Sequence, residues 1–104
     1  MTRTIKVVMC PANQRPYIKS IRNSLHAMQN AVGGYIEMIE LEDNLVIVCN
    51  EEGRLLGLPA NKSIMMPGLV GNCFIASASG EDLTDCSDIQ LILDACMRSW
   101  LRNY

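Results

Sequence analysis

The stretch that decides the fold covers residues 35–50 and reads YIEMIELEDNLVIVCN. Two runs rich in apolar residues, Tyr35–Leu41 and Leu45–Asn50, are separated by the polar segment Glu42-Asp43-Asn44. This pattern is typical of a β-hairpin. The second run is almost entirely apolar, so we expect it to be a central strand that is covered on both faces.

On the N-terminal side of the hairpin, the sequence predicts two further strands and a helix. Thr4–Cys10 is rich in β-branched residues, and Tyr17–Ile21 follows it after a proline-containing turn. Asn23 or Ser24 is expected to cap the helix, because its side-chain oxygen can accept a hydrogen bond from the first turn. Gly33-Gly34 should end the helix, since glycine readily adopts the left-handed conformation at a helix C-terminus. The predicted apolar stripe of this helix consists of Leu25, Met28 and Val32.

On the C-terminal side, the sequence predicts a short strand, a last strand and a second helix. Arg54–Leu58 is expected to be the short strand, and Leu69–Ala76 the last strand, with a bulge at Gly71. Ser87 precedes Gln90 by three residues, which is the spacing of a capping box at a helix start. The stripe of this helix that faces the core is predicted to contain Ile89, Ile92, Leu93, Cys96 and Trp100.

These elements define the fold class. The chain has 104 residues, of which 49% are hydrophobic and 19% charged, as in one globular domain. We therefore predict a single α+β domain over residues 1–104, with a mostly antiparallel sheet of four to six strands. Two helices are expected, near residues 24–33 and 87–101. No apolar run approaches the ~18 residues that span a bilayer, so no membrane partner is expected.

The cysteines indicate a reducing compartment. Their number is odd, and no two of them have the C-x-x-C spacing of zinc or redox sites. We expect them to be reduced thiols in the core of a protein in the cytoplasm of the host cell. No signal peptide is recognisable after Met1. The five are Cys10, Cys49, Cys73, Cys86 and Cys96.

Charge is divided unevenly along the chain. Residues 1–34 hold five basic residues and no acidic one, whereas residues 35–104 hold four basic and eleven acidic residues. The basic segment is compatible with a patch for an anionic partner, and it also has the composition of an organelle transit peptide. The simpler interpretation is that the two segments are neighbours in one sheet and neutralise each other across strands.

Three motifs resemble those of a known family. They are GGYIE at 33–37, NEEGR at 50–54 and GLPANK at 57–62, followed by GNCFI at 71–75 where the family carries G-T-F-F-I. Together they resemble the "domain of unknown function 3846" family, which consists of small proteins common in phages and mobile elements of bacteria. The resemblance implies a phage or mobile-element origin. It brings no established activity and no catalytic residues.

The residues needed for catalysis are scarce. His26 is the only histidine, and no Cys or Asp is close to it in sequence, so a zinc site is not expected. Glu51-Glu52 lies in a predicted turn, where adjacent carboxylates point apart. The sequence contains no G-x-S-x-G, P-loop or G-x-G-x-x-G motif. We predict a protein that is not an enzyme, with no catalytic residue, metal or cofactor.

A binding site is the remaining expectation. Asn50, Arg54, Asn61 and Lys62 combine amides and cations with glycines whose N–H groups can approach a ligand, which suits a phosphate or carboxylate. The alternative is that this segment only shapes turns. A nucleic-acid polymer is not expected as a partner, because 5% aromatic residues provide no stacking platform and the net charge is −2.

Two hypotheses for function follow. The first is a phage-encoded counter-defence protein that binds and sequesters a phosphorylated signalling nucleotide without catalysis. The second is a protein-binding module that inhibits or recruits a host protein, for instance a defence protein, through its acidic face or through Met65-Met66. The uneven charge and these two methionines also predict a homo-oligomer, with a homodimer as the expected form.

Overall fold

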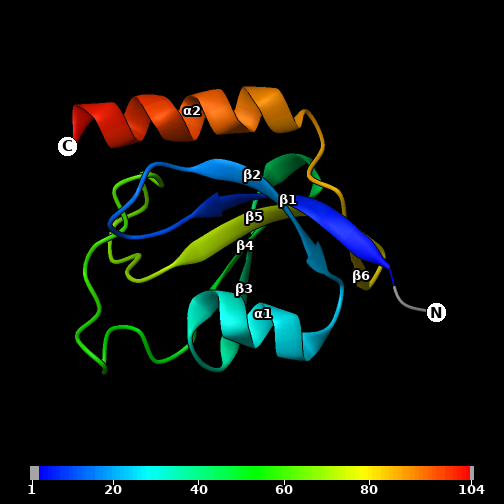
Figure 1. Ribbon diagram of the computed structural model, residues 1–104, viewed down its shortest axis with the longest axis horizontal. Coiled ribbons are helices and arrows are strands. Elements are labelled where there is room, and N and C mark those ends of the chain that lie inside the picture. Colours follow the sequence, from blue (N-terminus) through cyan, green and yellow to red (C-terminus); the bar gives the residue numbers. More distant parts are fainter. Residues whose placement is uncertain (1–2, 104) are drawn as a thin grey trace.

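An antiparallel sheet runs through the centre of the molecule, and one helix covers each of its faces (Figure 1). This arrangement comes from a computed structural model, which describes residues 3–103. The strands are β1 (Thr4–Cys10), β2 (Tyr17–Arg22), β3 (Ile36–Glu40), β4 (Leu45–Asn50), β5 (Cys73–Ser79) and β6 (Asp82–Thr84). The helices are α1 (Leu25–Val32), α2 (Ile89–Arg102) and the short 3-10 helix η1 (Glu42–Asn44). The predicted α+β class, the antiparallel sheet and the two α-helices are confirmed.

The predicted hairpin forms strands β3 and β4, which are neighbours in the sheet. The sheet runs β2-β1-β5-β4-β3, with β6 paired to β5, and each pair is antiparallel. β4 lies between β3 and β5 and is buried from Val46 to Asn50. The prediction of a central strand covered on both faces is therefore confirmed.

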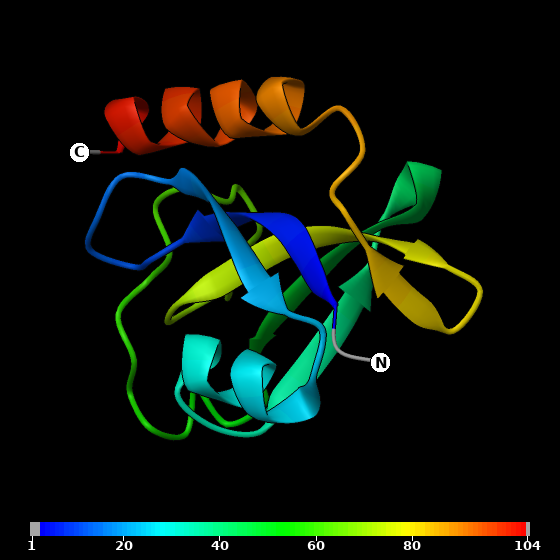
Figure 2. The ribbon, with the colours of Figure 1, turned by 45° about the vertical axis from the view of Figure 1, so that its right-hand side comes forward.

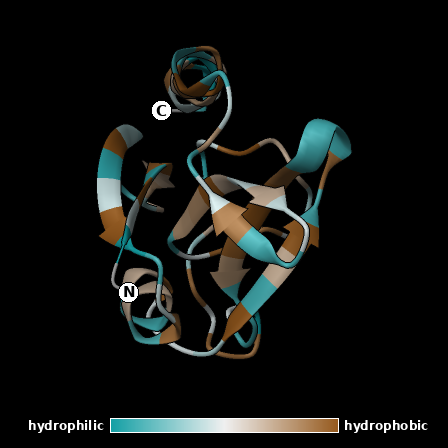
Figure 3. Cartoon of the chain, turned by 90° about the vertical axis from the view of Figure 1, so that its right-hand side faces the viewer, coloured by the Kyte–Doolittle hydropathy of each residue, from teal (hydrophilic) through white to brown (hydrophobic). Residues whose placement is uncertain are grey.

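The alternation of side chains along the strands produces two separate cores. Along β4, Val46 and Val48 belong to the core beneath α1, whereas Ile47 and Cys49 belong to the core beneath α2. Viewed along the sheet, much of each central strand is hydrophobic and lies between the two helices (Figure 3). We call these clusters the α1-side core and the α2-side core.

The two cores differ in composition. The α1-side core is built from aliphatic residues and Phe74, and it includes Met28 and Val32 of the predicted helix stripe. All five cysteines lie in the α2-side core, where they are free and buried, as predicted for core thiols. The predicted stripe of α2 also faces this side, and Trp100 is buried. Leu25 of the predicted α1 stripe is exposed instead.

α1 begins and ends as the sequence predicts. Ser24 is the N-cap, and its Oγ accepts a hydrogen bond from the Ala27 N–H at 3.2 Å. Gly33 follows the last helical residue with φ +81°, the left-handed conformation that glycine adopts without strain. Its N–H donates to the Gln29 carbonyl.

Of two further predicted strands, one is absent and the other has different bounds. Residues 54–58 form successive turns, because the N–H groups of Leu56 and Leu58 donate back to Glu52 and Gly53 and not to a neighbouring strand. The predicted strand Arg54–Leu58 is therefore wrong. The predicted strand Leu69–Ala76 begins only at Cys73, since residues 69–72 return across the long loop that joins β4 to β5.

The start of α2 also differs from the prediction. Ser87 is not the cap, because its N–H donates to Ser77 Oγ at 2.8 Å and the helix begins at Ile89. Asp88 occupies the N-cap position with φ +51° and makes no side-chain capping bond. Strand β6, which returns antiparallel to β5, was not predicted from the sequence (Figure 2).

Basic and acidic residues lie at opposite edges of the sheet. The edge strand β2 presents Lys19 and Arg22, whereas the edge strand β3 presents Glu37 and Glu40. These two edge strands therefore do not neutralise each other, whereas the basic and acidic segments are neighbours where β1 pairs with β5. Arg3 and Asp82, 3.8 Å apart, form the one ion pair within residues 3–103. Neither α-helix in that range combines the length and the apolar character needed to cross a bilayer.

Candidate functional site

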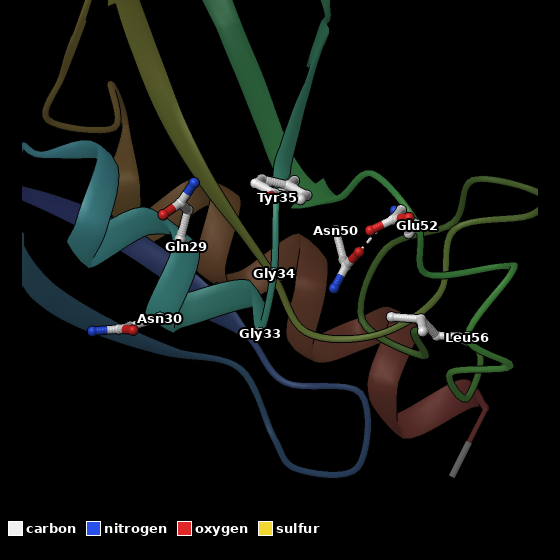
Figure 4. A pocket seen from close by; sticks show the side chains of 8 residues that line it. All are labelled: Gln29, Asn30, Gly33, Gly34, Tyr35, Asn50, Glu52 and Leu56. Atoms are coloured by element: carbon white, nitrogen blue, oxygen red, sulfur yellow. Dashed lines mark hydrogen bonds between the residues drawn. The ribbon is translucent and has the colours of Figure 1, made fainter.

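Two of the motifs noted in the sequence meet at one end of the sheet. The turn after α1 carries residues 33–35, and the turn after β4 carries residues 50–56. The sheet register pairs Ile36 with Asn50, and the Glu51 N–H donates to the Tyr35 carbonyl at 2.8 Å. Between the two turns and the end of α1 lies a hollow of about 490 Å³, which we call the motif groove (Figure 4).

Asn50 holds the two turns together. Its side chain is buried, its Nδ2 donates to the Val32 carbonyl at the end of α1, and its Oδ1 accepts from the Glu52 N–H. These bonds are 3.2 and 2.8 Å long. A Cβ at Gly34 would lie 2.9 Å from Asn50 Nδ2, so the close approach requires glycine. Asn50 is thus a structural link beneath the groove, and its amide already has protein partners.

The lining of the groove combines two exposed apolar side chains and one acidic residue with polar residues of α1. Tyr35 and Leu56 flank it and are 65% and 60% exposed. Asn50 lies between them in Figure 4, beside Glu52. Glu52 is the one charged residue of the lining, and the C-terminal end of α1 adds a partial negative charge. This combination suits an apolar group that is joined to a cation.

Arg54 lies in a neighbouring hollow of about 220 Å³, which shares Asn50 with the motif groove. The same hollow is lined by Glu37 and Glu51. Both carboxylates are exposed, and together they outweigh the single positive charge of Arg54. An anion there would meet like charges.

Asn61 fixes the long loop between β4 and β5. It is buried, and its Nδ2 donates to the carbonyls of Cys10 and Gly71, both at 2.8 Å. Its Oδ1 accepts from the Ser63 N–H at 3.0 Å. Asn61 therefore ties the loop to the end of β1, and it supplies structure where the sequence predicted a ligand contact.

Lys62 lies beside α2 and does not line the motif groove. It is exposed, and its Nζ lies 5.9 Å from the centre of the Trp100 ring, within the range of a cation–π contact. It lines a third hollow with Asn61 and Met65. The structure therefore divides the four predicted ligand residues into two pairs: Asn50 with Arg54, and Asn61 with Lys62.

Tyr35 and Leu56 were not predicted from the sequence as site residues. For Tyr35, the predicted hairpin carried an indication, because its register places residue 36 opposite residue 50 and so brings the first two motifs together. Nothing in the sequence indicated that Leu56 is exposed, since residues 54–58 were expected to join the sheet.

The groups considered for catalysis are dispersed. His26 is exposed, and its Nε2 lies 3.3 Å from Asn30 Nδ2. Glu51 and Glu52 are also exposed. In the described part of the chain, no three His, Cys, Asp or Glu side chains are arranged to hold a metal ion.

Comparison with known proteins gives a family and no further relative. No curated protein and no solved structure matches this chain. Residues 5–97 match the family described as "Domain of unknown function (DUF3846)", which agrees with the resemblance of the sequence motifs. This match covers most of the 104 residues, and the chain belongs to that family.

Proposed function

We propose that this protein is a non-enzymatic binding module that docks a segment of a partner protein in the motif groove. The observation that carries the proposal is the pair of exposed apolar residues, Tyr35 and Leu56, which line one hollow together with Glu52. Large exposed apolar side chains around a hollow are typical of protein-binding surfaces, and tyrosine is enriched among residues that dominate binding energy.

The charge around the groove indicates the chemistry of the partner. Glu52 lies in the groove, and Glu37 and Glu51 line the hollow beside it, against a single cation, Arg54. Complementary charge favours a segment in which Lys or Arg is next to an apolar residue. The apolar side chain would lie between Tyr35 and Leu56.

The biological setting belongs to the same proposal. We place the protein in the cytoplasm of a bacterial host, as a phage or mobile-element product that counters defence by inhibiting or recruiting a host protein. We also expect a homo-oligomer, because Met65 and Leu101 leave apolar surface away from the groove. Light scattering across micromolar concentrations tests this expectation, and only an 11.6 kDa species would contradict it.

Sequestration of a nucleotide remains the competing hypothesis. It requires cations that converge on phosphate groups. Arg54 and Lys62 line different hollows, and the amides of Asn50 and Asn61 are engaged within the protein. The geometry therefore favours a polypeptide ligand over a phosphorylated one.

Selection from a random peptide library displayed on yeast tests the proposal. Peptides that bind the wild-type chain should contain Lys or Arg beside an apolar residue. Leu56→Ala should weaken their binding at least ~10-fold, and Glu52→Gln by about 10-fold, as expected for loss of an interfacial anchor and of a charge-assisted bond. Leu91→Ala is the matched control, because Leu91 on α2 is 62% exposed, close to the exposure of Leu56.

Two outcomes would count against the proposal. Selected peptides that bind Leu56→Ala as tightly as the wild type would place their site elsewhere. Calorimetry with cyclic dinucleotides and ADP-ribose-type nucleotides provides the second test. A dissociation constant below ~100 μM that rises about 10–150-fold in Arg54→Ala would support the nucleotide hypothesis.

A further inference from the structure

Two cysteines that are far apart in sequence are in contact in the α2-side core. Cys10 is the last residue of β1, and Cys96 lies in the middle of α2. Their Sγ atoms are 3.8 Å apart, with the Cys10 thiol donating to Cys96 Sγ. A disulfide has an S–S length of about 2.05 Å, so an approach of roughly 1.8 Å would join them.

Cys96 also borders a hollow that a small molecule can occupy. It lines a hollow of about 260 Å³ between α2 and the loop that carries Ser63 and Met65. Of the five cysteines, all of them among the described residues, only Cys96 lines this hollow. A water molecule occupies about 30 Å³, so a molecule of similar size, such as hydrogen peroxide, fits easily. Cys10 is fully buried behind Cys96.

A polar atom in the wall of the same hollow lacks a protein partner. Ser63 is 2% exposed, and within residues 3–103 its Oγ makes no hydrogen bond. A buried hydroxyl of this kind costs free energy unless a small polar molecule satisfies it. Ser63 and Cys96 both line this hollow, whose other lining residues are largely apolar.

We propose that Cys96 is a modification site for peroxides, and that Cys10 resolves the product into a disulfide that ties α2 to β1. In the first step, the Cys96 thiolate attacks one peroxide oxygen and the O–O bond breaks. The leaving hydroxide takes up a proton, and Cys96 becomes a sulfenic acid. In the second step, Cys10 sulfur attacks Cys96 sulfur, the S–O bond breaks, and the proton of Cys10 leaves with the hydroxide as water. Two thiols are oxidised by two electrons, and the peroxide is reduced to water.

The hydrogen bond between the two thiols assigns their roles. It lowers the pKa of Cys96, whose thiolate accepts the bond, and together with burial it raises the pKa of Cys10. The thiolate is the nucleophile in such reactions, so Cys96 attacks the peroxide first, and Cys10 gives up its proton only when its sulfur attacks in the second step. Burial raises the pKa of Cys73 to about 12 and that of Cys86 to about 11, which keeps both thiols protonated and slow.

Mass spectrometry of the reduced 104-residue chain, treated with one equivalent of hydrogen peroxide, tests this proposal. The wild type should lose about 2 Da, and proteolysis should recover a peptide pair joined through Cys10 and Cys96. A reductant should restore the original mass. Oxidation that begins at Cys49, Cys73 or Cys86, or a chain whose five thiols all survive, would overturn the proposal.

Single substitutions separate the two roles. Cys96→Ser should abolish the disulfide, whereas Cys10→Ser should leave a sulfenic acid at position 96 that dimedone traps. Cys49→Ser is the matched control, because Cys49 belongs to the same core but lines a different hollow, and it should form the disulfide as the wild type does. Circular dichroism confirms that each variant is folded. Dimedone labelling at position 10 in Cys96→Ser, at the rate seen at position 96 in Cys10→Ser, would contradict the assigned order.

Discussion

The two faces of the sheet are filled in different ways. The α1-side core consists of aliphatic side chains around Phe74, and Val7, Val48 and Ala76 in it are fully buried. The α2-side core contains five cysteines and is bordered by half-buried residues such as Ile92 and a hollow of about 260 Å³. A cysteine buries fewer carbon atoms than leucine or phenylalanine, so this side gains less from the hydrophobic effect. We infer that the α1 side contributes most of the stability, while the α2 side retains space and reactive groups.

The largest expected effect comes from a substitution in the α1-side core. Phe74→Ala should lower the free energy of unfolding by about 3–5 kcal/mol, because it leaves a cavity in a fully packed environment. Cys73→Ala, at the neighbouring position on the other face, should cost only about 1 kcal/mol. Urea denaturation followed by circular dichroism measures both. Equal losses would show that the two cores are equally well packed.

The second prediction concerns the loop that closes the α2 side. Asn61→Ala removes three buried hydrogen bonds and leaves the Cys10 and Gly71 carbonyls without their donor. We expect a loss of about 3 kcal/mol by the same denaturation assay, since each unsatisfied buried group costs about 1–3 kcal/mol. Asn50→Ala provides the comparison on the other side, and its two bonds predict about 2 kcal/mol. A loss below ~0.5 kcal/mol at Asn61 would show that the loop does not depend on this side chain.

The third prediction uses the titration of the buried thiols. The pKa of Cys73 is raised to about 12 and that of Cys86 to about 11, both by burial, so the folded chain retains these protons longer than the unfolded chain. The stability that they contribute is complete below about pH 9 and is lost as the pH rises towards 11–12. Each of these two thiols should contribute about 1 kcal/mol per pH unit, so we expect a decline of about 2 kcal/mol per pH unit in urea denaturation between pH 9 and 11. Cys73→Ala should reduce the decline by about half, and an unchanged slope in that variant would assign it to other groups.

The smallest expected effect comes from a substitution on the surface, outside both cores. Arg54→Ala should change the free energy of unfolding by less than about 0.5 kcal/mol, because Arg54 is exposed and forms none of the ion pairs among residues 3–103. Thermal or urea denaturation beside the wild type measures this difference. A loss above ~1 kcal/mol would show that the guanidinium near Gly68 supports the loop.

Much of the fold could be predicted from local patterns. The hairpin at 35–50, the strand Thr4–Cys10 and the helix between Ser24 and Gly33 follow from periodicity and capping, which are local properties of the chain. The errors have two causes. At residues 54–58, short-range bonds from Leu56 to Glu52 and from Leu58 to Gly53 close turns in a segment that was expected to be a strand. At Ser87, the N–H donates to the Ser77 side chain on β5, and this contact between separate elements shifts the start of the helix.

The candidate site was less predictable for the second of these reasons. Asn50 and Asn61 were predicted to contact a ligand, but the sequence could not show whether their amides face a ligand or the protein. Distant partners decide this, since Asn50 donates to Val32 and Asn61 donates to Cys10. The contact between Cys10 and Cys96 likewise arises from the packing of α2 on the sheet, and no spacing in the sequence indicates it.

One titration tests most directly whether the motif groove is the partner site. The ¹⁵N-labelled chain is titrated with the tightest peptide from the yeast selection, and backbone amide shifts are recorded by NMR. We predict that the largest changes fall in residues 29–35 and 50–56, on both sides of the groove, and that residues 89–103 of α2 and its C-cap stay unchanged. Changes concentrated on α2 or around Lys62, with residues 29–35 unaffected, would contradict the account.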